Sequence, residues 1–459
     1  MLAARSIASS SWTAGASRQR LAVFAALWAA AILFDLASNH AWAANAQLAP
    51  LAAWTLLQPD RVTPLAALAA GHLLTFVRAA PFVSNHTLFA VMVDATLLAT
   101  IAIVMIRHRR LRVDADEIFD TWAPAVRAAV IVLYAFVVFH KLNADFFNPA
   151  VSCGTAFYAT QIERFAFLPH TAWAGMLSLY AAIATEAAIP VLLSLRRTRN
   201  TGVLVAAAFH WMLAVNPRDA FYNFSSMLFA VFFLFAAAGA TGAWIARIDT
   251  RRVMRASRTF LGVAAGCVVV QAWTRRASGG VDPFLLLWAV YGLGLMAAFV
   301  WIVRGRWKHS APTAAVFTLP VPALVVLPLV VALNGVSPYV GFKTELSWAM
   351  FSNLRTDAAR SNHFIVPAAW RISGDEDDLV AVVASSDRGL AQVGRRGDVI
   401  PYFELRRHPE ASITYVQNGV AHAFAHIRDD PRYTPLSWVA RKTRAFRPVS
   451  AAGPETCHH

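Results

Sequence analysis

The chain has 459 residues, of which 58% are hydrophobic and only 15% are charged, and its mean hydropathy is +0.49. Soluble domains carry about 25% charged residues, so this composition argues against a water-soluble globular protein. The formal charge of +15 is typical of nucleic-acid-binding proteins, but here the arginines gather in short loops between apolar runs. We therefore expect membrane lipids, and no nucleic acid, as partners.

Apolar runs of membrane-spanning length follow one another along the chain. A span needs about 20 apolar residues, and runs that reach or approach this length cover 21–38, 64–80, 86–106, 121–140, 172–195, 201–216, 222–242, 284–303 and 316–334. Two shorter stretches, 46–58 and 259–273, either cross, re-enter or lie at the interface. We predict an all-α polytopic membrane bundle over residues 21–336, with about nine to eleven membrane segments.

Arginine-rich loops indicate the orientation of these segments. The clusters lie at 107–112, 196–200, 247–258 and 304–308. Counting crossings places all of them on one face, which the positive-inside rule assigns to the cytoplasm; only Arg275 and Arg276 dissent. The 141–171 segment and everything after 336 then lie outside, and we expect a bacterial inner membrane with an extracytoplasmic C-terminal region.

The N-terminus has three interpretations. Residues 1–20 form a basic tail with three arginines and no acid, which favours the cytoplasm and requires 46–58 to cross. Alternatively, 21–38 followed by "AWAA" is a cleaved signal peptide, although Asp35 near the end of the run argues against it. A mitochondrial-type presequence is the third alternative.

Three cysteines do not make a disulfide framework or a metal site, so we predict no metal. Cys153 and Cys457 fall on the oxidising side, which leaves one bridge open, but we expect them to be unpaired. The sequence holds no GxGxxG, P-loop or HExxH motif and no convincing internal repeat.

The composition changes at residue 337, where charges rise and long apolar runs stop. Strand-like segments appear in "HFIVPAAWRIS", "DLVAVVASS", "VIPYFELRR" and "SITYVQNGVAHAFAHI", and "QNG" at 417–419 predicts a hairpin turn. We predict a small, mostly-β extramembrane domain over 337–459. The aromatic segment 339–357 should lie on the membrane surface or plug the outer mouth of the bundle.

Ionisable side chains inside spans are costly and are candidate functional groups by default. They are Asp94, Arg127, the His140–Lys141 pair, Glu186 and His210. Each also has a structural interpretation. Glu186 can join helices by pairing with Arg127 or His210, Asp94 can serve packing, and Lys141 can be an interfacial lysine that keeps its ammonium in water.

Glu186 and His210 belong to consecutive helices joined by a short loop. Each lies twelve residues from the loop centre near Thr198, or about 18 Å at 1.5 Å per residue. We therefore predict similar depth and direct contact between carboxyl and imidazole, a pair suited to proton relay.

Three stretches resemble the horizontally transferred transmembrane (HTTM) family, which includes vitamin K-dependent gamma-carboxylase. "FHKLNADFFNP" at 139–149 is similar to its most recognisable motif, in which the carboxylase has the form Lys-Leu-Asp-Ala-Asp-Trp; here it contains Asn143 and Asp145. "AAFHWMLAVNPRDAFYNFSSMLFA" at 207–230 resembles the Phe-His-x-Met segment and the helix after it. "ELSWAMFSNLR" at 345–355, with Trp348, resembles the Ser-Trp-x-Met stretch.

The resemblance implies that Lys141 is the base that deprotonates a vitamin K-like lipid quinol, whose oxygenation and epoxidation drive proton abstraction and carboxylation. His210 matches a histidine of the second motif. Only a neutral amine accepts a proton, and His140 with a rim of phenylalanines (Phe136, Phe139, Phe146 and Phe147) is expected to disfavour the ammonium. His140 replaces a lysine of the family motif, and the short tail argues against a propeptide-recognising carboxylase.

Two functions therefore compete. The first is a membrane enzyme that uses a lipophilic quinol, with Lys141, His210 and Glu186 as its catalytic group. The second is a non-enzymatic protein that binds a lipid or a partner, and a conventional secondary transporter ranks third because paired broken helices are lacking. A cavity beside Lys141 favours the enzyme, and solid packing there favours the alternative. The sequence identifies no protein partner.

Overall fold

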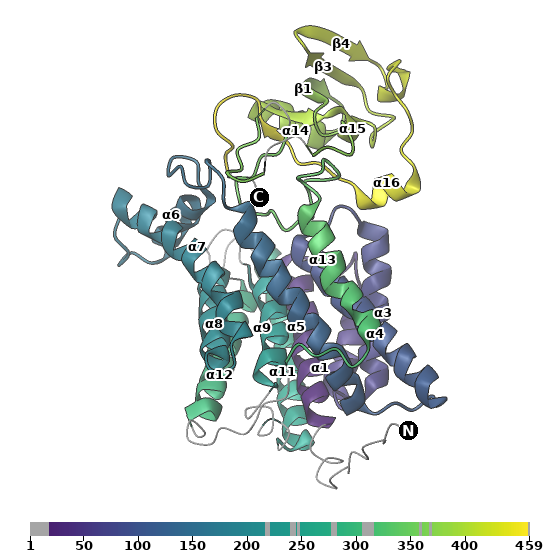
Figure 1. Cartoon of the computed structure of the whole chain (residues 1–459), viewed down its shortest axis with the longest axis vertical. Coiled ribbons are helices and arrows are strands. Elements are labelled where there is room, and N and C mark those ends of the chain that lie inside the picture. Colours follow the sequence, from purple (N-terminus) through teal and green to yellow (C-terminus); the bar gives the residue numbers. More distant parts are fainter. Residues whose placement is uncertain are drawn as a thin grey trace, which may run out of the picture.

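The computed structural model describes residues 18–215, 221–238, 245, 248–276, 282–304, 316–357, 360–366 and 370–457. A helical bundle forms one end of the molecule and a small β-containing domain the other (Figure 1). The bundle helices are α1 (Arg18–Ser38), α2 (Leu48–Leu57), α3 (Val62–Ala79), α4 (Asn85–His108), α5 (Ala115–His140), α6 (Cys153–Arg164), α7 (Ala172–Ser194), α8 (Arg199–Ala214), α9 (Tyr222–Ala236), α11 (Thr250–Arg276), α12 (Pro283–Arg304) and α13 (Val326–Val336).

In the described part of the chain, seven helices are long and apolar enough to cross a membrane: α1, α3, α4, α5, α7, α11 and α12. This is compatible with an integral membrane protein. Three apolar segments are shorter: Leu48–Leu57, Tyr222–Ala236 and Pro322–Val336. The stretch 259–273, which looked too short from the sequence, belongs to the 27-residue α11. The expected total of about nine to eleven segments stays a prediction.

Helix α1 occupies the centre of the bundle. Its apolar side chains, such as Phe24 and Trp28, are almost fully buried, and it packs against α2 and α9. The start of α1 is tied to the start of α5 by the bond from Arg20 to Asp120, at 2.8 Å. Residues 1–17 of the expected tail lie outside the described residues.

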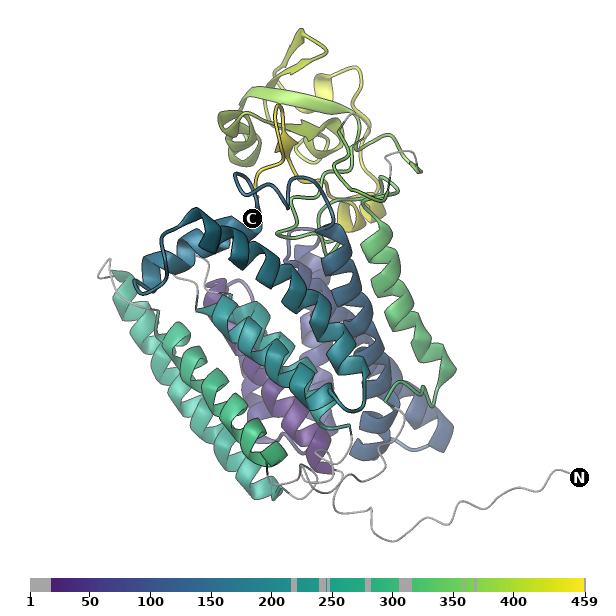
Figure 2. The ribbon, with the colours of Figure 1, turned by 60° about the vertical axis from the view of Figure 1, so that its left-hand side comes forward.

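The described arginines of the four clusters lie at one end of the bundle. They follow α4, precede α8, begin α11 and end α12, opposite the C-terminal domain (Figure 2). From the end of α1, α2 runs back towards the arginine end, α3 runs away from it, and α4 returns to it. The start of α1 therefore lies at the arginine end as well. The assignment of that end to the cytoplasm stays a prediction.

The C-terminal domain contains a five-stranded antiparallel sheet in the order β4-β3-β1-β2-β5. Its strands are β1 (Leu379–Ser385), β2 (Asp398–Pro401), β3 (Ile413–Gln417), β4 (Val420–Phe424) and β5 (Val449–Ser450), and its helices are α14 (Arg388–Arg396), α15 (Tyr402–Leu405) and α16 (Trp438–Thr443). The predicted hairpin is present, because Asn418 and Gly419 both have positive φ, at 49° and 79°, and join β3 to β4.

Two expected strands of this domain are wrong in part. In "HFIVPAAWRIS", the described residues form no strand, although His363 makes an isolated bridge to Asn143; residues 367–369 lie outside the description. In "VIPYFELRR", β2 ends at Pro401 and the chain turns into α15. Proline lacks the N–H that would extend the ladder, and Tyr402, Phe403 and Leu405 are buried from the helix instead.

Segment 339–357, called the plug below, lies against the end of the bundle, which is one of its two predicted places. It runs back under the domain as irregular chain, with positive φ at Leu346, Trp348, Phe351 and Asn353. Non-glycine residues rarely adopt this conformation, so tertiary contacts must hold it. The Trp348 indole donates to Val331 O at 2.8 Å and its backbone N–H to Asn85 Oδ1 at 2.9 Å.

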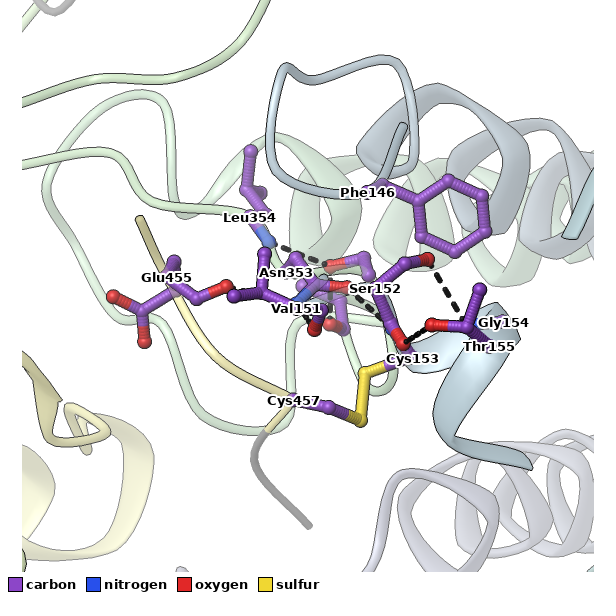
Figure 3. Close-up of a disulfide and its surroundings, with 12 residues drawn as sticks. Phe146, Val151, Ser152, Cys153, Gly154, Thr155, Asn353, Leu354, Glu455 and Cys457 are labelled. Carbon is purple, nitrogen blue, oxygen red and sulfur yellow. Dashed lines mark hydrogen bonds between the residues drawn. A yellow bond between two sulfur atoms is a disulfide. The ribbon is translucent and has the colours of Figure 1, made fainter. Parts of the chain in front are cut away.

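The expectation that Cys153 and Cys457 are unpaired is wrong. They form a disulfide between the start of α6 and the end of the described tail, 304 residues apart (Figure 3). Asn353 of the plug joins the same place, because its side chain accepts from Cys153 N and donates to Val151 O and Glu455 O, each at 2.9 Å. The tail is thus fixed to the outer end of the bundle.

Candidate functional site

A cavity of about 110 Å³ lies at the end of the bundle nearest the C-terminal domain, beside Lys141. About 10–15 Å³ of such space holds one water molecule, so this volume accommodates a molecule of several heavy atoms. Helices α4 to α9 and the plug contribute its walls, which are mostly aromatic and aliphatic. They include Phe89, Tyr134, Phe146, Phe157, Phe209, Phe221, Phe224, Met227, Trp348, Met350 and Phe351.

Lys141 and Glu186 form a buried ion pair on the wall of this cavity. Lys141 follows the last turn of α5, and its Nζ donates to the Glu186 carboxylate of α7. The two side chains are only 8% and 12% exposed, and the Phe146 ring centroid is 5.8 Å from Nζ. A lysine that merely anchors a helix end would place its ammonium in water, and Lys141 does not.

Glu186 and His210 do not pair as predicted. Both line the cavity, but Glu186 bonds Lys141, whereas His210 Nε2 lies 2.6 Å from the Tyr134 hydroxyl. Equal depth on neighbouring helices is not enough to bring two side chains together, because each helix can face any direction around its axis. The Glu186 carboxylate on α7 points towards Lys141 at the end of α5. His210 Nδ1 is buried without a hydrogen-bond partner among the described residues. Its imidazole therefore retains one nitrogen that a cavity ligand can use.

His140 contacts the segment 339–357 through both of its ring nitrogens. Its Nε2 lies 3.0 Å from Ser347 O and its Nδ1 lies 2.7 Å from the Tyr339 hydroxyl. Burial raises the pKa of Tyr339, so the phenol keeps the proton that it donates. A neutral imidazole fits these contacts, because Nε2–H can donate to Ser347 O and Nδ1 can accept from the Tyr339 hydroxyl. The expected influence of His140 on the Lys141 amine stays a prediction.

Asn143 and Asp145 shape the turn after α5 and lie outside the cavity wall. Asn143 donates to His140 O and Ser352 O, at 2.8 and 2.7 Å, and accepts from Phe146 N at 2.8 Å. Asp145 Oδ2 accepts from the Asn362 amide and from Glu455 N. These two residues of the 139–149 stretch position Phe146 and the tail.

Two predicted supporting residues lie elsewhere. Arg127 lies in the half of α5 that is nearer to the arginine-rich end of the bundle. Its guanidinium donates to Leu234 O at 3.0 Å and to Val316 O at 2.8 Å, and it does not contact Glu186. Asp94 is buried between α1, α3 and α4 and bonds His72 and Trp28. Trp348, in contrast, lines the cavity.

Sequence reasoning missed several cavity residues. Tyr134, Val137 and Lys141 are spaced i, i+3, i+7, which places them on one face of α5 and would have identified Tyr134. Asn85 and His86 sit at the first turn of α4, a polar pair before an apolar run. The irregular plug residues Met350 and Phe351 carry no such signal, because no helical or strand period relates them.

No protein-family model matches this chain, and no similar curated protein or solved structure is found. The function therefore has to be argued from the cavity itself. Within the described ranges, no three His, Cys, Asp or Glu side chains are placed to hold a metal ion.

Proposed function

We propose that this protein is an integral membrane enzyme that binds a lipophilic quinol in the cavity and takes a proton from its hydroxyl with Lys141. The observation that carries the proposal is the Lys141–Glu186 pair, buried on the wall of an aromatic cavity. Flat aromatic walls suit a quinol ring, and the paired amine and carboxyl suit its polar edge. The HTTM resemblance adds oxygenation, epoxidation and carboxylation to this proposal.

The pair supplies a base by moving one proton along its own hydrogen bond. Transfer of a proton from the Lys141 ammonium to the Glu186 carboxylate leaves a neutral amine, the form of lysine that can accept a proton. The amine then accepts the hydroxyl proton of the quinol. The resulting ammonium lies beside the new phenolate and stabilises it electrostatically. His210, with its unpartnered Nδ1, orients the ligand from the opposite side.

Orientation in the membrane follows from the arginine clusters. We place them in the cytoplasm of a bacterium, which puts the cavity mouth, the plug and the C-terminal domain on the extracytoplasmic side of the inner membrane. A lipophilic substrate then reaches the cavity from the bilayer.

Mass spectrometry of co-purifying lipids and quinones tests the binding step. Ala182 lines the cavity, so Ala182→Phe fills it and should lower the bound quinone at least about tenfold, equivalent to 1.4 kcal/mol. Val290→Phe is the matched control, because Val290 on α12 is 71% exposed outside the cavity. Equal amounts of quinone in both variants would place the binding site elsewhere.

Oxygen uptake with a naphthoquinol tests the chemistry. The double variant Lys141→Met and Glu186→Gln removes both charges while keeping side-chain volume, and it should abolish uptake without loss of protein from the membrane. If the wild type binds no quinone and shows no uptake, the alternative function gains support, in which the cavity holds a lipid and the charges are structural.

A further inference from the structure

A second group of ionisable side chains lies in the bundle, outside the Lys141–Glu186 pair. It surrounds a smaller cavity of about 20 Å³, which is room for one water molecule. Asp35 of α1, His72 of α3 and His86 of α4 line this small cavity, and Asp94 bonds His72. His86 also lines the large cavity. It is therefore the junction between the two spaces.

The inner pair, His72 and Asp94, is held by hydrogen bonds on the Asp94 side and borders the small cavity on the His72 side. His72 Nδ1 lies 2.7 Å from Asp94 Oδ2, while the Trp28 indole donates to Asp94 Oδ1 at 2.9 Å. His72 and Asp94 are 3% and 1% exposed. The His72 ring also lines the small cavity. A water molecule there can exchange a proton with it.

The outer pair, His86 and Asp35, reaches the surface. His86 Nε2 lies 3.2 Å from Asp35 Oδ1, and His86 Nδ1 is buried without a partner among the described residues. The Asp35 side chain is 24% exposed and accepts from Asn39 at 2.8 Å. Asp35 is close to the end of α1, at the same end of the bundle as Lys141. The pair thus joins a buried nitrogen to the outer solvent.

Few other charges face this group. Helix α2 packs on α1 and α3 and carries no ionisable side chain. Tyr222 of α9 donates to Asp282, which precedes α12, at 2.6 Å, and Gln271 of α11 donates to the same carboxylate. From α5, Lys141 faces the large cavity that His86 shares. Four titratable groups in such apolar surroundings are costly, a pattern typical of proton relays.

We propose that His86 and Asp35 conduct protons between the large cavity and the outer surface, with His72 and Asp94 as a buried proton acceptor on the same path. A proton from the cavity binds His86 Nδ1, and the imidazolium releases its Nε2 proton to Asp35, which passes it to water. In the branch, the His86 imidazolium gives its Nε2 proton to the water of the small cavity, the water passes a proton to His72 Nε2, and the His72 Nδ1 proton moves to Asp94. No electrons move, and Asp94 holds the proton until it returns by the same route.

This inference rests on the proposed function for the source of the proton, because deprotonation of a quinol at Lys141 leaves one proton per turnover to be removed. The path itself can be tested without a quinol. A pH jump on the full chain in lipid nanodiscs, followed by infrared spectroscopy of the carboxyl C=O band, reports protonation of buried carboxylates directly.

In the wild type, the carboxyl band should respond to the pH jump with a slow component that comes from Asp94. Asp94→Asn should remove this component. Asp35→Asn should slow the response at least about tenfold. Asp120→Asn is the matched control, because Asp120 pairs with Arg20 at the other end of the bundle and should leave the response unchanged. An Asp94→Asn spectrum like that of the wild type, or an unchanged rate in Asp35→Asn, would overturn the proposal.

Quinol-linked oxygen uptake in Asp35→Asn separates the two proposals. If the wild type shows the expected infrared response but no oxygen uptake, the proton path is supported and the quinol proposal fails. If the wild type and Asp35→Asn take up oxygen at the same rate, the quinol proposal is supported and the proton path fails.

Discussion

Helix α5 carries two buried cations, and they differ in what surrounds them. Arg127 donates to two backbone carbonyls, Leu234 O and Val316 O, and joins α5 to α9 and to the chain before α13. Lys141, fourteen residues later and about 21 Å along the axis, meets a carboxylate beside a cavity. Burial of a charge therefore does not identify a site by itself. A charge with a titratable partner and adjoining empty space does.

The largest expected effect is at the Lys141–Glu186 pair. Lys141→Met or Glu186→Gln alone leaves one buried charge without its partner and should destabilise the protein by about 3–5 kcal/mol. The double variant removes both charges and should recover most of that loss. Chemical unfolding in detergent measures all three. Additive losses in the double variant would show that the pair is not coupled and would weaken its assignment as one unit.

Arg127→Met should cost somewhat less, about 3 kcal/mol, because it leaves the carbonyls of Leu234 and Val316 without donors. In the part of the chain that the structure describes, the Arg127 guanidinium bonds backbone carbonyls, so no second side-chain substitution is expected to restore the lost stability. Quinone content per folded molecule should match that of the wild type, because Arg127 does not line the cavity. If Arg127→Met released the bound quinone, the contrast between the two cations would fail.

The sequence predicted the elements that depend on local pattern. Long apolar runs became helices, a small antiparallel sheet formed in the C-terminal part of the chain, and Asn418–Gly419 joins its hairpin. It also gave Lys141 as a residue of the outer end. These features are set by hydrophobic period and turn chemistry, which neighbouring residues carry.

The pairings of the site were not predictable in the same way. Depth along two helices follows from residue counts, but the direction of a side chain depends on how each helix is rotated by its packing. Glu186 accordingly met Lys141 and not His210. The Cys153–Cys457 bond joins segments 304 residues apart, and no spacing rule relates them. The contacts of His140 with Tyr339 and Ser347 were not predictable either, because these partners lie about 200 residues away in the chain.

The smallest of these effects concerns a third buried charge, Glu376, which lies in the solidly packed C-terminal domain. It accepts from Thr356 at 2.6 Å and from Arg371 at 2.5 Å, yet burial raises its pKa from 4.5 to about 7. Between these values the folded domain binds more protons than the unfolded chain, so the free energy of unfolding should fall by about 2 kcal/mol as pH rises from about 4.5 to 7.

Amide hydrogen exchange of β1 and β3, corrected for intrinsic pH dependence, measures this fall in the full-length protein. Glu376→Gln should flatten the profile, whereas Glu410→Gln should not, because the Glu410 side chain is 66% exposed. Quinol-linked activity should not follow this titration, since Glu376 lines neither the large nor the small cavity. A common pH profile for tail stability and activity would instead show that the carboxylate in the domain and the pair in the bundle respond as one system.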